Sequence, residues 1–361
     1  MISSINMFAH RSRVPRPRQF LSPRQRIKRS PIGGIMKYRF VAFTICSLVL
    51  GVSAATGTAS GQDYPTKPIR LVTAFAGGGD LIVRMIADKM SGALKQPVVV
   101  EPIPAASGAQ AAGIVARAAP DGYTLLAGSS TTHIVKPLTL KSISYDPVKD
   151  FSPVTILYEP TLVLAVKADL GISDVPGLIE RSKKTRTLLG ATGAGGNSHI
   201  SMLALNKAGG GALQLVPYKD DGSLVLGLLS GDIDATIVTG SAISRILHDP
   251  GNAEKIRVIG LLSDGPRPGF DNVKTVAEQV PGFKELGIFA AIWGPAGLPR
   301  DIVARLNAVI RESLQDPTIR DRMLSMGSMV NPGTPEQLGN LVSSELSKVG
   351  SLLKQAGIEP E

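Results

Sequence analysis

The feature that most constrains the fold is the alternation of short apolar runs with helical periodicity over residues 69–128. Residues 69–75 form an apolar, β-rich run, and apolar residues at helical spacing begin directly after Asp80. Two further apolar runs, 97–101 and 123–128, lie on either side of an Ala-rich segment. A strand–helix–strand–helix–strand order is the signature of a doubly wound parallel sheet. This part of the chain is therefore predicted to be an α/β unit.

A second α/β unit and a helical C-terminal segment are predicted after the first unit. The last 75 residues carry helical periodicity, with a capped helix start at Asp316-Pro317 and a capping box at Thr334 and Gln337 that opens the final helix. Helices that close back on the first unit predict a two-lobed α/β protein, with 63–163 plus 286–361 in lobe 1 and 164–285 in lobe 2. A ligand crevice is expected between the lobes, at the carboxyl ends of strands. The expected strands after Phe151 are 154–158, 161–167, 188–192, 213–217, 235–238 and 256–261, and the expected helices in this stretch are 175–184 and 198–208.

The positive charge of the chain is concentrated in its N-terminal segment. The whole chain has 39 Lys and Arg against 29 Asp and Glu, a net charge of +10. Residues 1–62 contain ten of the basic residues and no acid, so the remaining 29 basic and 29 acidic residues balance. A nucleic-acid-binding groove needs a basic patch on the folded body. We therefore expect no nucleic-acid partner.

Residues 36–62 are predicted to be a cleaved export signal. Two basic residues precede a 13-residue apolar run at 40–52, and small residues follow it. The run is shorter than the ~20 residues of a membrane-spanning helix, and an uncleaved anchor is the alternative. Residues 1–35 are rich in Arg, Pro and Ser, which predicts a disordered basic extension upstream of a true start at Met36. The mature protein is expected in the periplasm.

The chain's single cysteine, Cys46, lies inside that apolar run and lacks the flanking residues of a lipoprotein signal. The mature body therefore has no disulfide, and its stability depends on its core. A body of roughly 300 residues is large enough, because such a chain buries about three-quarters of its unfolded surface.

Two Gly-rich loops, each between a predicted strand and helix, are candidate anion sites. The first is Gly77-Gly78-Gly79-Asp80. Consecutive glycines let backbone N–H groups approach a ligand, and the helix N-terminus behind them favours an anion. The alternative is a tight turn capped by the aspartate. The second loop, 192–198, resembles a dinucleotide loop only superficially, because Ser198 replaces its third glycine. We interpret it as an anion-binding loop that faces the first from the other lobe.

Polar residues at two other strand ends are expected to complete the pocket. The segment Ser129-Ser130-Thr131-Thr132 follows the strand at 123–128, and its hydroxyl and N–H groups can hydrogen-bond a carboxylate. A helix-capping cluster is the alternative. Tyr218 and Lys219 end a later strand, and a solvated side chain is the alternative for the lysine.

Motifs of common enzymes are missing from the sequence. It contains no nucleophile elbow, P-loop or zincin motif. His133, His199 and His248 lack metal-ligand spacing and the body has no cysteine, so neither a metal nor a cofactor is predicted. A hydrolase that pairs Ser129 or Ser198 with a nearby histidine stays an alternative, because triads are defined by geometry.

Seven short segments, in order along the body, together resemble one protein family. They are YPTKPIR (64–70), PVVVE (97–101), APDGYTLL (119–126), YDPVKDF (145–151), VPYK (216–219), TVAE (275–278) and GPAG (294–297). The chain is similar to the extracytoplasmic solute-binding proteins of tripartite tricarboxylate transporters, the Bug-type receptors. The resemblance implies a two-lobed, type II periplasmic-binding-protein (Venus-flytrap) fold without enzymatic activity. It also implies a membrane permease as partner; a paralogue that docks on a sensor protein is the alternative, and a monomer is expected.

The resemblance also implies where a ligand binds. Family members bind small carboxylates through backbone N–H groups and ordered water from two facing loops, one in each lobe. Here these loops are 75–80 and 192–198. The first is shorter than in the family and lacks its prolines, and Asp220 replaces a glycine after Lys219. The predicted ligand-binding residues are Phe75, Gly77, Gly78, Gly79, Asp80, Ser129, Ser130, Thr131, Thr132, Thr192, Gly193, Gly195, Asn197, Ser198, Tyr218 and Lys219.

Overall fold

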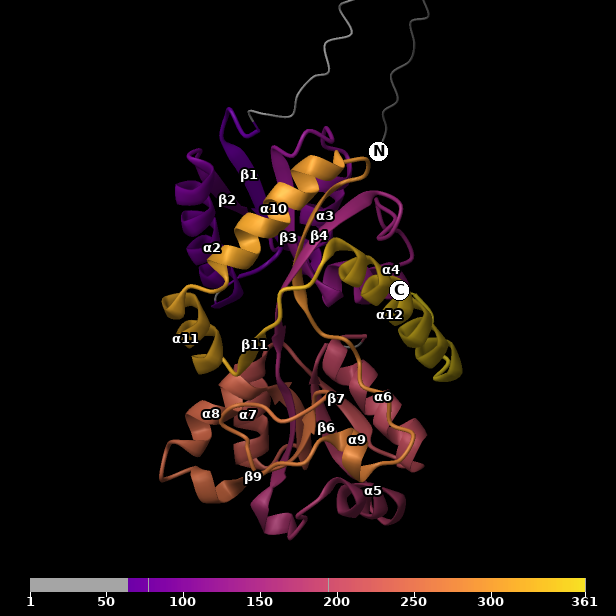
Figure 1. Ribbon diagram of the computed structural model, residues 1–361. Coiled ribbons are helices and arrows are strands. Elements are labelled where there is room, and N and C mark those ends of the chain that lie inside the picture. Colours follow the sequence, from indigo (N-terminus) through magenta and orange to yellow (C-terminus); the bar gives the residue numbers. More distant parts are fainter. Residues whose placement is uncertain (1–63, 77, 194, 361) are drawn as a thin grey trace, which may run out of the picture. The chain divides into compact units, whose positions relative to one another are not determined.

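The computed structural model describes residues 64–76, 78–193 and 195–360, which contain two separate β-sheets (Figure 1). The first sheet has six strands in the order β11-β4-β10-β3-β1-β2, and the second has five in the order β7-β6-β8-β5-β9. Helices cover both faces of each sheet, and we call each sheet with its helices a lobe. The two-lobed α/β architecture that the sequence predicts is confirmed. The predicted basic extension and export signal, and Gly77 of the first loop, lie outside the described residues.

The first sheet combines parallel and antiparallel strands. β1 lies between β2 and β3 and is parallel to both, whereas β10 lies between β3 and β4 and is antiparallel to both. The short strand β11 pairs with the outer side of β4. Leu71 and Leu125 are fully buried, as expected for strands that helices cover on both faces. The strands are β1 (Ile69–Thr73), β2 (Val98–Pro102), β3 (Thr124–Ser129), β4 (Phe151–Pro160), β10 (Ala290–Pro295) and β11 (Ser328–Val330).

β10 and β11 correct the prediction that the last 75 residues are only helical. Every residue of β10 is buried, and its sequence is a continuous apolar run. Such a run has no two-residue alternation, so periodicity alone does not distinguish a buried strand from a helical segment. Because β10 is antiparallel to its neighbours, the first sheet is mixed rather than wholly parallel as predicted.

Helices pack on the two faces of the first sheet in two core clusters. α2, α10 and α11 cover the face that holds Leu71, and α3, η2 and α12 cover the face that holds Val72. The caps of two C-terminal helices are as predicted: Asp316 caps α11, and Thr334 and Gln337 form a capping box at α12. The helices are α2 (Gly78–Leu94), η1 (Ala105–Gly108), α3 (Ala109–Ala116), η2 (Thr131–Val135), α4 (Lys136–Thr139), α10 (Arg300–Ser313), α11 (Pro317–Ser325) and α12 (Pro335–Gln355).

The second lobe repeats this layout on a smaller scale. β6 is parallel to β7 and β8, whereas β5 is antiparallel to β8 and β9. α5, α6 and α9 pack on one face, and α7 and α8 on the other. The strands are β5 (Leu162–Lys167), β6 (Leu188–Thr192), β7 (Gln214–Tyr218), β8 (Ala235–Thr239) and β9 (Ile256–Leu262). The helices are η3 (Ala168–Leu170), α5 (Val175–Lys184), α6 (Asn197–Gly209), α7 (Asp221–Ser230), α8 (Gly240–Leu247), η4 (Ala253–Lys255) and α9 (Val276–Gln279).

Two segments, which we call the crossovers, connect the lobes. In the first crossover a single residue, Thr161, separates β4 from β5. Its N–H donates to Gly327 O (3.0 Å) and its carbonyl accepts from Gly240 N (2.8 Å), so it contacts both lobes. The second crossover, residues 285–289, leads from the second lobe into β10. The lobe boundary expected after residue 163 lies inside β5, whose pairing with β8 already includes Leu162.

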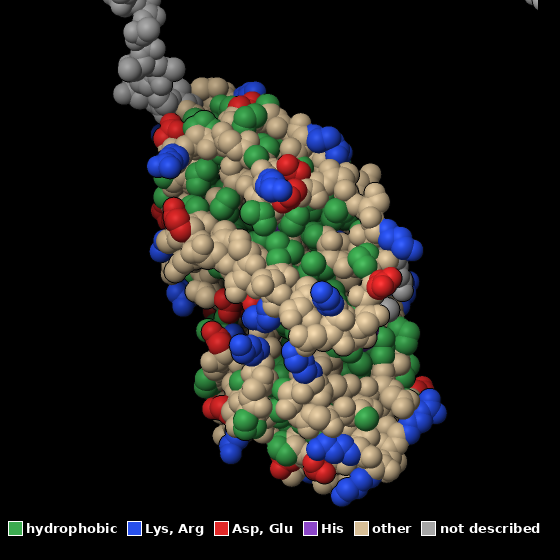
Figure 2. All heavy atoms as spheres, turned by 90° about the vertical axis from the view of Figure 1, so that its right-hand side faces the viewer, with side chains coloured by type: hydrophobic (Ala, Val, Ile, Leu, Met, Phe, Trp, Pro, Cys, Tyr) green, Lys and Arg blue, Asp and Glu red, His purple; other side chains and the backbone are tan. Residues whose placement is uncertain are grey.

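The surface of the described body carries both signs of charge. Figure 2 shows Lys and Arg side chains interspersed with Asp and Glu side chains over one face. Among the helices of the described residues, none is both long enough and apolar enough to cross a membrane.

Candidate functional site

A cavity of about 220 Å³, the inner cavity, lies where strands of both sheets end. The carboxyl ends of strands are the usual position of ligand sites in open α/β sheets. The structure brings seven of the predicted residues together here: Phe75, Ser129, Ser130, Thr131, Thr192, Asn197 and Ser198. The lining is completed by Tyr158, Pro160, Leu162, Asp221, Val238, Thr239, Ile288, Phe289 and Ala290.

The loop after β3 presents hydroxyl groups to the inner cavity. Three of its backbone amides already have acceptors: Ser129 N–H donates to Thr132 Oγ1 (3.0 Å), Ser130 N–H to Phe289 O (2.9 Å) and Thr131 N–H to Ser129 Oγ (3.2 Å). Ser130 and Thr131 therefore offer a ligand hydroxyls rather than backbone N–H groups. Thr132 is fully buried behind the loop and fixes its shape.

The loop after β6 positions the start of α6. Gly193 (φ 71°) and Gly195 (φ 72°) adopt left-handed backbone conformations, which residues with a Cβ atom rarely adopt. The Gly195 N–H donates to His199 Nδ1 at 2.9 Å, which ties the turn to the helix. The N–H groups of Asn197 and Ser198, in the first turn of α6, have no acceptor within the helix. With the helix dipole, they make this wall of the inner cavity favourable for an anion.

A hydrogen bond between described residues joins the two loops across the inner cavity. Asn197 Nδ2 donates to Ser130 Oγ at 3.5 Å, which is long for such a bond. Beside it, Ser198 Oγ lies 3.1 Å from Thr192 Oγ1. A ligand oxygen placed between Asn197 and Ser130 would replace one long bond with two shorter ones and would contact both lobes.

A larger cavity of about 1210 Å³, the outer cavity, opens between α2 and α11 of the first lobe and α7 and α8 of the second. Gly78 and Gly79, in the first turn of α2, line this cavity rather than the inner one. Asp80 lines neither cavity, and its carboxylate accepts a hydrogen bond from Arg84 Nε at 2.7 Å. The outer cavity also has apolar side chains (Val225, Leu226, Ile246, Met326) and basic ones (Arg245, Arg322).

Two consecutive acids at the start of α7 have different roles. Asp220 is exposed and caps the helix by accepting from the Ser223 N–H at 2.8 Å, and this bond lowers its pKa. Asp221 Oδ2 accepts from Thr239 Oγ1 (2.6 Å) and Thr239 N–H (3.3 Å), and Asp221 lines both the inner and the outer cavity. Asp220 departs visibly from the family's glycine, whereas Asp221 was not predicted from the sequence. The sequence pattern that could have indicated Asp221 is an acidic residue directly after a helix cap, at the carboxyl end of a strand.

Several predicted residues support the loops without lining either cavity. Tyr218 packs its ring against Gly227 of α7, and its carbonyl accepts from the Gly193 N–H at 3.0 Å. Lys219 is exposed and lines neither cavity. Gly193 and Gly195 set the shape of the second loop but do not line the inner cavity. The carboxyl end of β7 therefore contributes less to the lining of the inner cavity than the sequence predicts.

The two histidines near the loops are structural. His133 is fully buried and stacks on Trp293 with ring centroids 3.7 Å apart, and burial lowers its pKa to about 3. His199 accepts from the Gly195 N–H, and burial lowers its pKa also. Neither is hydrogen-bonded to a loop serine, as the hydrolase alternative requires. Within the described part of the chain, no group of three or more His, Cys, Asp or Glu could hold a metal ion.

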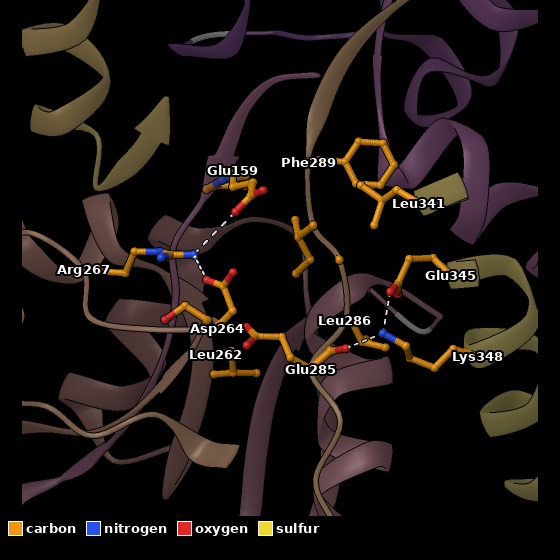
Figure 3. A pocket seen from close by; sticks show the side chains of 14 residues that line it. Glu159, Leu262, Asp264, Arg267, Glu285, Leu286, Phe289, Leu341, Glu345 and Lys348 are labelled. Atoms are coloured by element: carbon orange, nitrogen blue, oxygen red, sulfur yellow. Dashed lines mark hydrogen bonds and ion pairs between the residues drawn. The ribbon is translucent and has the colours of Figure 1, made fainter. Parts of the chain in front are cut away.

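A third cavity of about 240 Å³, the charged cavity, is lined by the end of β4 and by the second crossover, among other segments (Figure 3). Arg267, nearly buried, donates to Asp264 at 2.9 Å and lies 3.5 Å from Glu159 of β4. This ion-pair cluster connects the second lobe to β4 of the first lobe. Three residues line both the inner and the charged cavity: Pro160, Ile288 and Phe289.

A second ion pair lies on the other wall of the charged cavity. Lys348 of α12 pairs with Glu345 and donates to the Glu285 carbonyl at 2.7 Å, which connects the first lobe to the second crossover. In Figure 3 the Glu285 side chain points from the crossover into the cavity, toward Asp264. Burial and, to a lesser extent, the negative charge of Asp264 raise the pKa of Glu285 to about 8.

Known proteins resemble this chain in sequence and in fold. Residues 82–358 match the family described as the tripartite tricarboxylate transporter family receptor. A UPF0065 protein of Bordetella bronchiseptica is 30% identical over 316 residues, 87% of this chain and 91% of that one. The solved structure of R. palustris Rpa4515 with adipate is 29% identical with a TM-score of 0.69, covering 83% of this chain and 100% of that one. MatC from Rhodopseudomonas palustris with bound malate is 28% identical with a TM-score of 0.66, covering 80% and 100%.

Proposed function

This chain belongs to the receptor family of tripartite tricarboxylate transporters, and from that premise we propose that it binds a small carboxylate between its lobes and delivers it to the transporter's membrane permease. The family membership confirms the resemblance that the seven sequence segments indicated. The family and its solved relatives are solute-binding receptors and not enzymes.

The inner cavity is the observation that carries the proposed ligand class. It offers hydroxyls from Ser130 and Thr131 on one side and the first turn of α6, with Asn197 and Ser198, on the other. Neutral donors together with a helix N-terminus favour a carboxylate without requiring a basic side chain. The adipate and malate in the two solved relatives support the same class of ligand.

Closure of the lobes is the proposed mechanism. We propose that the two lobes, joined at the two crossovers, rotate about them. A ligand in contact with both walls of the inner cavity stabilises the closed state in proportion to its extra contacts there. The long Asn197–Ser130 hydrogen bond supports this mechanism, because it is the polar contact that a ligand would replace.

Export is proposed on the basis of residues 36–62. In this proposal the signal is cleaved, and the mature receptor acts as a monomer in the periplasm. The family consists of periplasmic binding proteins, which supports that location. The permease is proposed as the partner that receives the ligand.

Binding is tested by a thermal-shift panel of mono-, di- and tricarboxylates on the mature chain, followed by titration calorimetry. A ligand that binds only the folded state stabilises it by RT ln(1 + [L]/Kd). At least one carboxylate is expected to raise Tm in a saturable way, without being turned over. If none does so while the protein stays folded, the proposed ligand class is wrong.

Delivery is tested in the cell that carries the gene. Deletion of the gene is expected to abolish uptake of the carboxylate found in the panel, and re-expression is expected to restore it. Uptake that persists without the receptor, with its permease intact, would contradict the delivery role and leave the binding role standing.

A further inference from the structure

The charged side chain in the lining of the inner cavity is negative, which does not suit a purely anionic ligand. Among the described residues that line it, Asp221 is the only acidic or basic side chain. The remaining polar lining consists of hydroxyl groups and one amide. A simple dicarboxylate would therefore meet a carboxylate in this cavity and no positively charged side chain.

Asp221 is held in position by the end of β8. Its Oδ2 accepts from Thr239 Oγ1 at 2.6 Å and from the Thr239 N–H at 3.3 Å. Both residues line the inner and the outer cavity, so the carboxylate lies where the two adjoin. None of the ion pairs among the described residues includes Asp221. Its negative charge is therefore open to a partner from the ligand.

Two parts of the lining of the inner cavity prefer opposite charges. The first turn of α6 and the hydroxyls of Ser130 and Thr131 favour a carboxylate. Asp221 favours a cation, because two close carboxylates repel each other unless one is protonated or a positive group neutralises them. A neutral ligand gains from neither group, whereas a plain diacid gains from the helix start and is repelled by Asp221.

We propose that the ligand carries an ammonium group beside its carboxylate, as an amino acid does, with the carboxylate at Asn197 and Ser198 and the ammonium at Asp221. This inference rests on the proposed carboxylate-binding function. The rest of the ligand extends past Asp221 into the outer cavity, whose walls carry apolar side chains and Arg245 and Arg322. Asp221 thus determines specificity for the amino group.

A structural role for Asp221 is the competing explanation. An acid in the first turn of a helix stabilises that helix, and Asp221 also ties α7 to β8. The variant Asp221→Asn separates the two roles, because an amide oxygen still accepts from Thr239 but carries no charge. Asp220→Asn is the matched control, since this neighbouring acid is exposed and lines neither cavity.

The test measures pairs of ligands that differ only in the amino group: aspartate with succinate, glutamate with glutarate, and 2-aminoadipate with adipate. Titration calorimetry on the mature wild-type chain is expected to show at least one amino acid that binds about tenfold or more tightly than its partner, an ordinary difference for one charge–charge contact. In Asp221→Asn, that ratio is expected to fall to about one, and the plain diacid is expected to bind more tightly than in wild type. Asp220→Asn should keep the wild-type ratio.

Two results would overturn the proposal. One is a plain diacid that binds the wild type as tightly as its amino partner. The other is an amino preference that Asp221→Asn leaves intact. If Asp221→Asn does not fold, judged by its Tm and circular dichroism, Asp221→Ser replaces it with the same expectation. Binding of plain diacids alone would reject the ammonium and keep the proposed function, whereas a lack of binding by every carboxylate would reject both.

Discussion

The inner and the charged cavity have nearly the same volume, about 220 and 240 Å³, and share the wall formed by Pro160, Ile288 and Phe289. Their chemistry differs. The inner cavity is lined by neutral hydroxyls, one amide and a single acid. The charged cavity contains four acids and two bases, and most of these form ion pairs with each other.

This difference indicates which cavity receives a solute. In the charged cavity Arg267 and Lys348 already have carboxylate partners, so a ligand would have to displace interactions within the protein. In the inner cavity the hydroxyls and the first turn of α6 are available, and Asp221 has no basic partner among the described residues. The two cavities do not differ in volume. They differ in whether their polar groups already have partners within the protein. We therefore propose that the inner cavity binds the solute and that the charged cavity connects the lobes.

The largest expected effect comes from filling each cavity with a Trp side chain. Thr131→Trp is expected to weaken binding of the best carboxylate about 100-fold or more, equivalent to about 2.7 kcal/mol, because the indole occupies the ligand's space. Leu341→Trp, the matched change in the charged cavity, is expected to leave Kd within about threefold. Titration calorimetry measures both. The reverse order of effects, in variants that melt like wild type, would exchange the roles of the two cavities.

Removal of the central cation of the charged cavity should reduce stability. Arg267→Met leaves the carboxylates of Glu159 and Asp264 without their partner and is expected to lower the free energy of unfolding by about 2 kcal/mol. This figure is below that of a fully buried pair, because the Asp264 side chain is 82% exposed. Urea denaturation measures the change.

The control for this variant is Lys149→Met, which breaks an exposed ion pair with Asp146. Its effect is expected to stay within about 0.5 kcal/mol. Equal effects of the two variants would show that the cluster around Arg267 does not connect the lobes.

Stability should depend on pH through Glu285. Its pKa is raised to about 8 in the folded state, so the folded protein keeps a proton that the unfolded chain loses near pH 4.5. The resulting stabilisation is present at low pH and is lost as pH rises toward 8, with a slope below about 1.4 kcal/mol per pH unit because the side chain is only partly buried. Urea denaturation of wild type and Glu285→Gln at pH 5 to 9 measures it. The stability of wild type relative to the variant should fall with pH, and a constant difference would contradict the shift.

The smallest expected effect concerns a single hydroxyl of the inner cavity. Ser198→Ala should weaken carboxylate binding by about 0.5–1.5 kcal/mol if Ser198 Oγ makes an ordinary hydrogen bond to the ligand. Its matched control is Ser263→Ala, a buried serine that lines the charged cavity. A Kd equal to that of wild type would remove Ser198 from the ligand's contacts.

The parts of the fold that carry local patterns were predictable from the sequence. The α/β alternation, the caps at Asp316 and Thr334 and the loops after β3 and β6 follow from periodicity and turn chemistry. β10 was not predicted because the sequence of a fully buried strand is an uninterrupted apolar run, which periodicity does not distinguish from a helical segment. Tyr218 was predicted in the pocket from its strand end, but its ring packs on α7, an orientation set by tertiary contacts.

The charged cavity could not be predicted, because its residues come from segments that are distant in sequence. Glu159 lies near the end of β4, Arg267 lies after β9, Glu285 lies in the second crossover and Lys348 belongs to α12. No spacing rule relates these positions. Asp221 is different: it follows a recognisable helix cap, but its role depends on Thr239 of another strand.

A crystal structure of the mature chain with the tightest-binding carboxylate from the panel tests the central claim most directly. We expect the ligand in the inner cavity, with carboxylate oxygens within hydrogen-bonding distance of Ser130 on one lobe and of Asn197 or Ser198 on the other. A ligand bound in the charged cavity, or one that contacts a single lobe, would contradict the assignment.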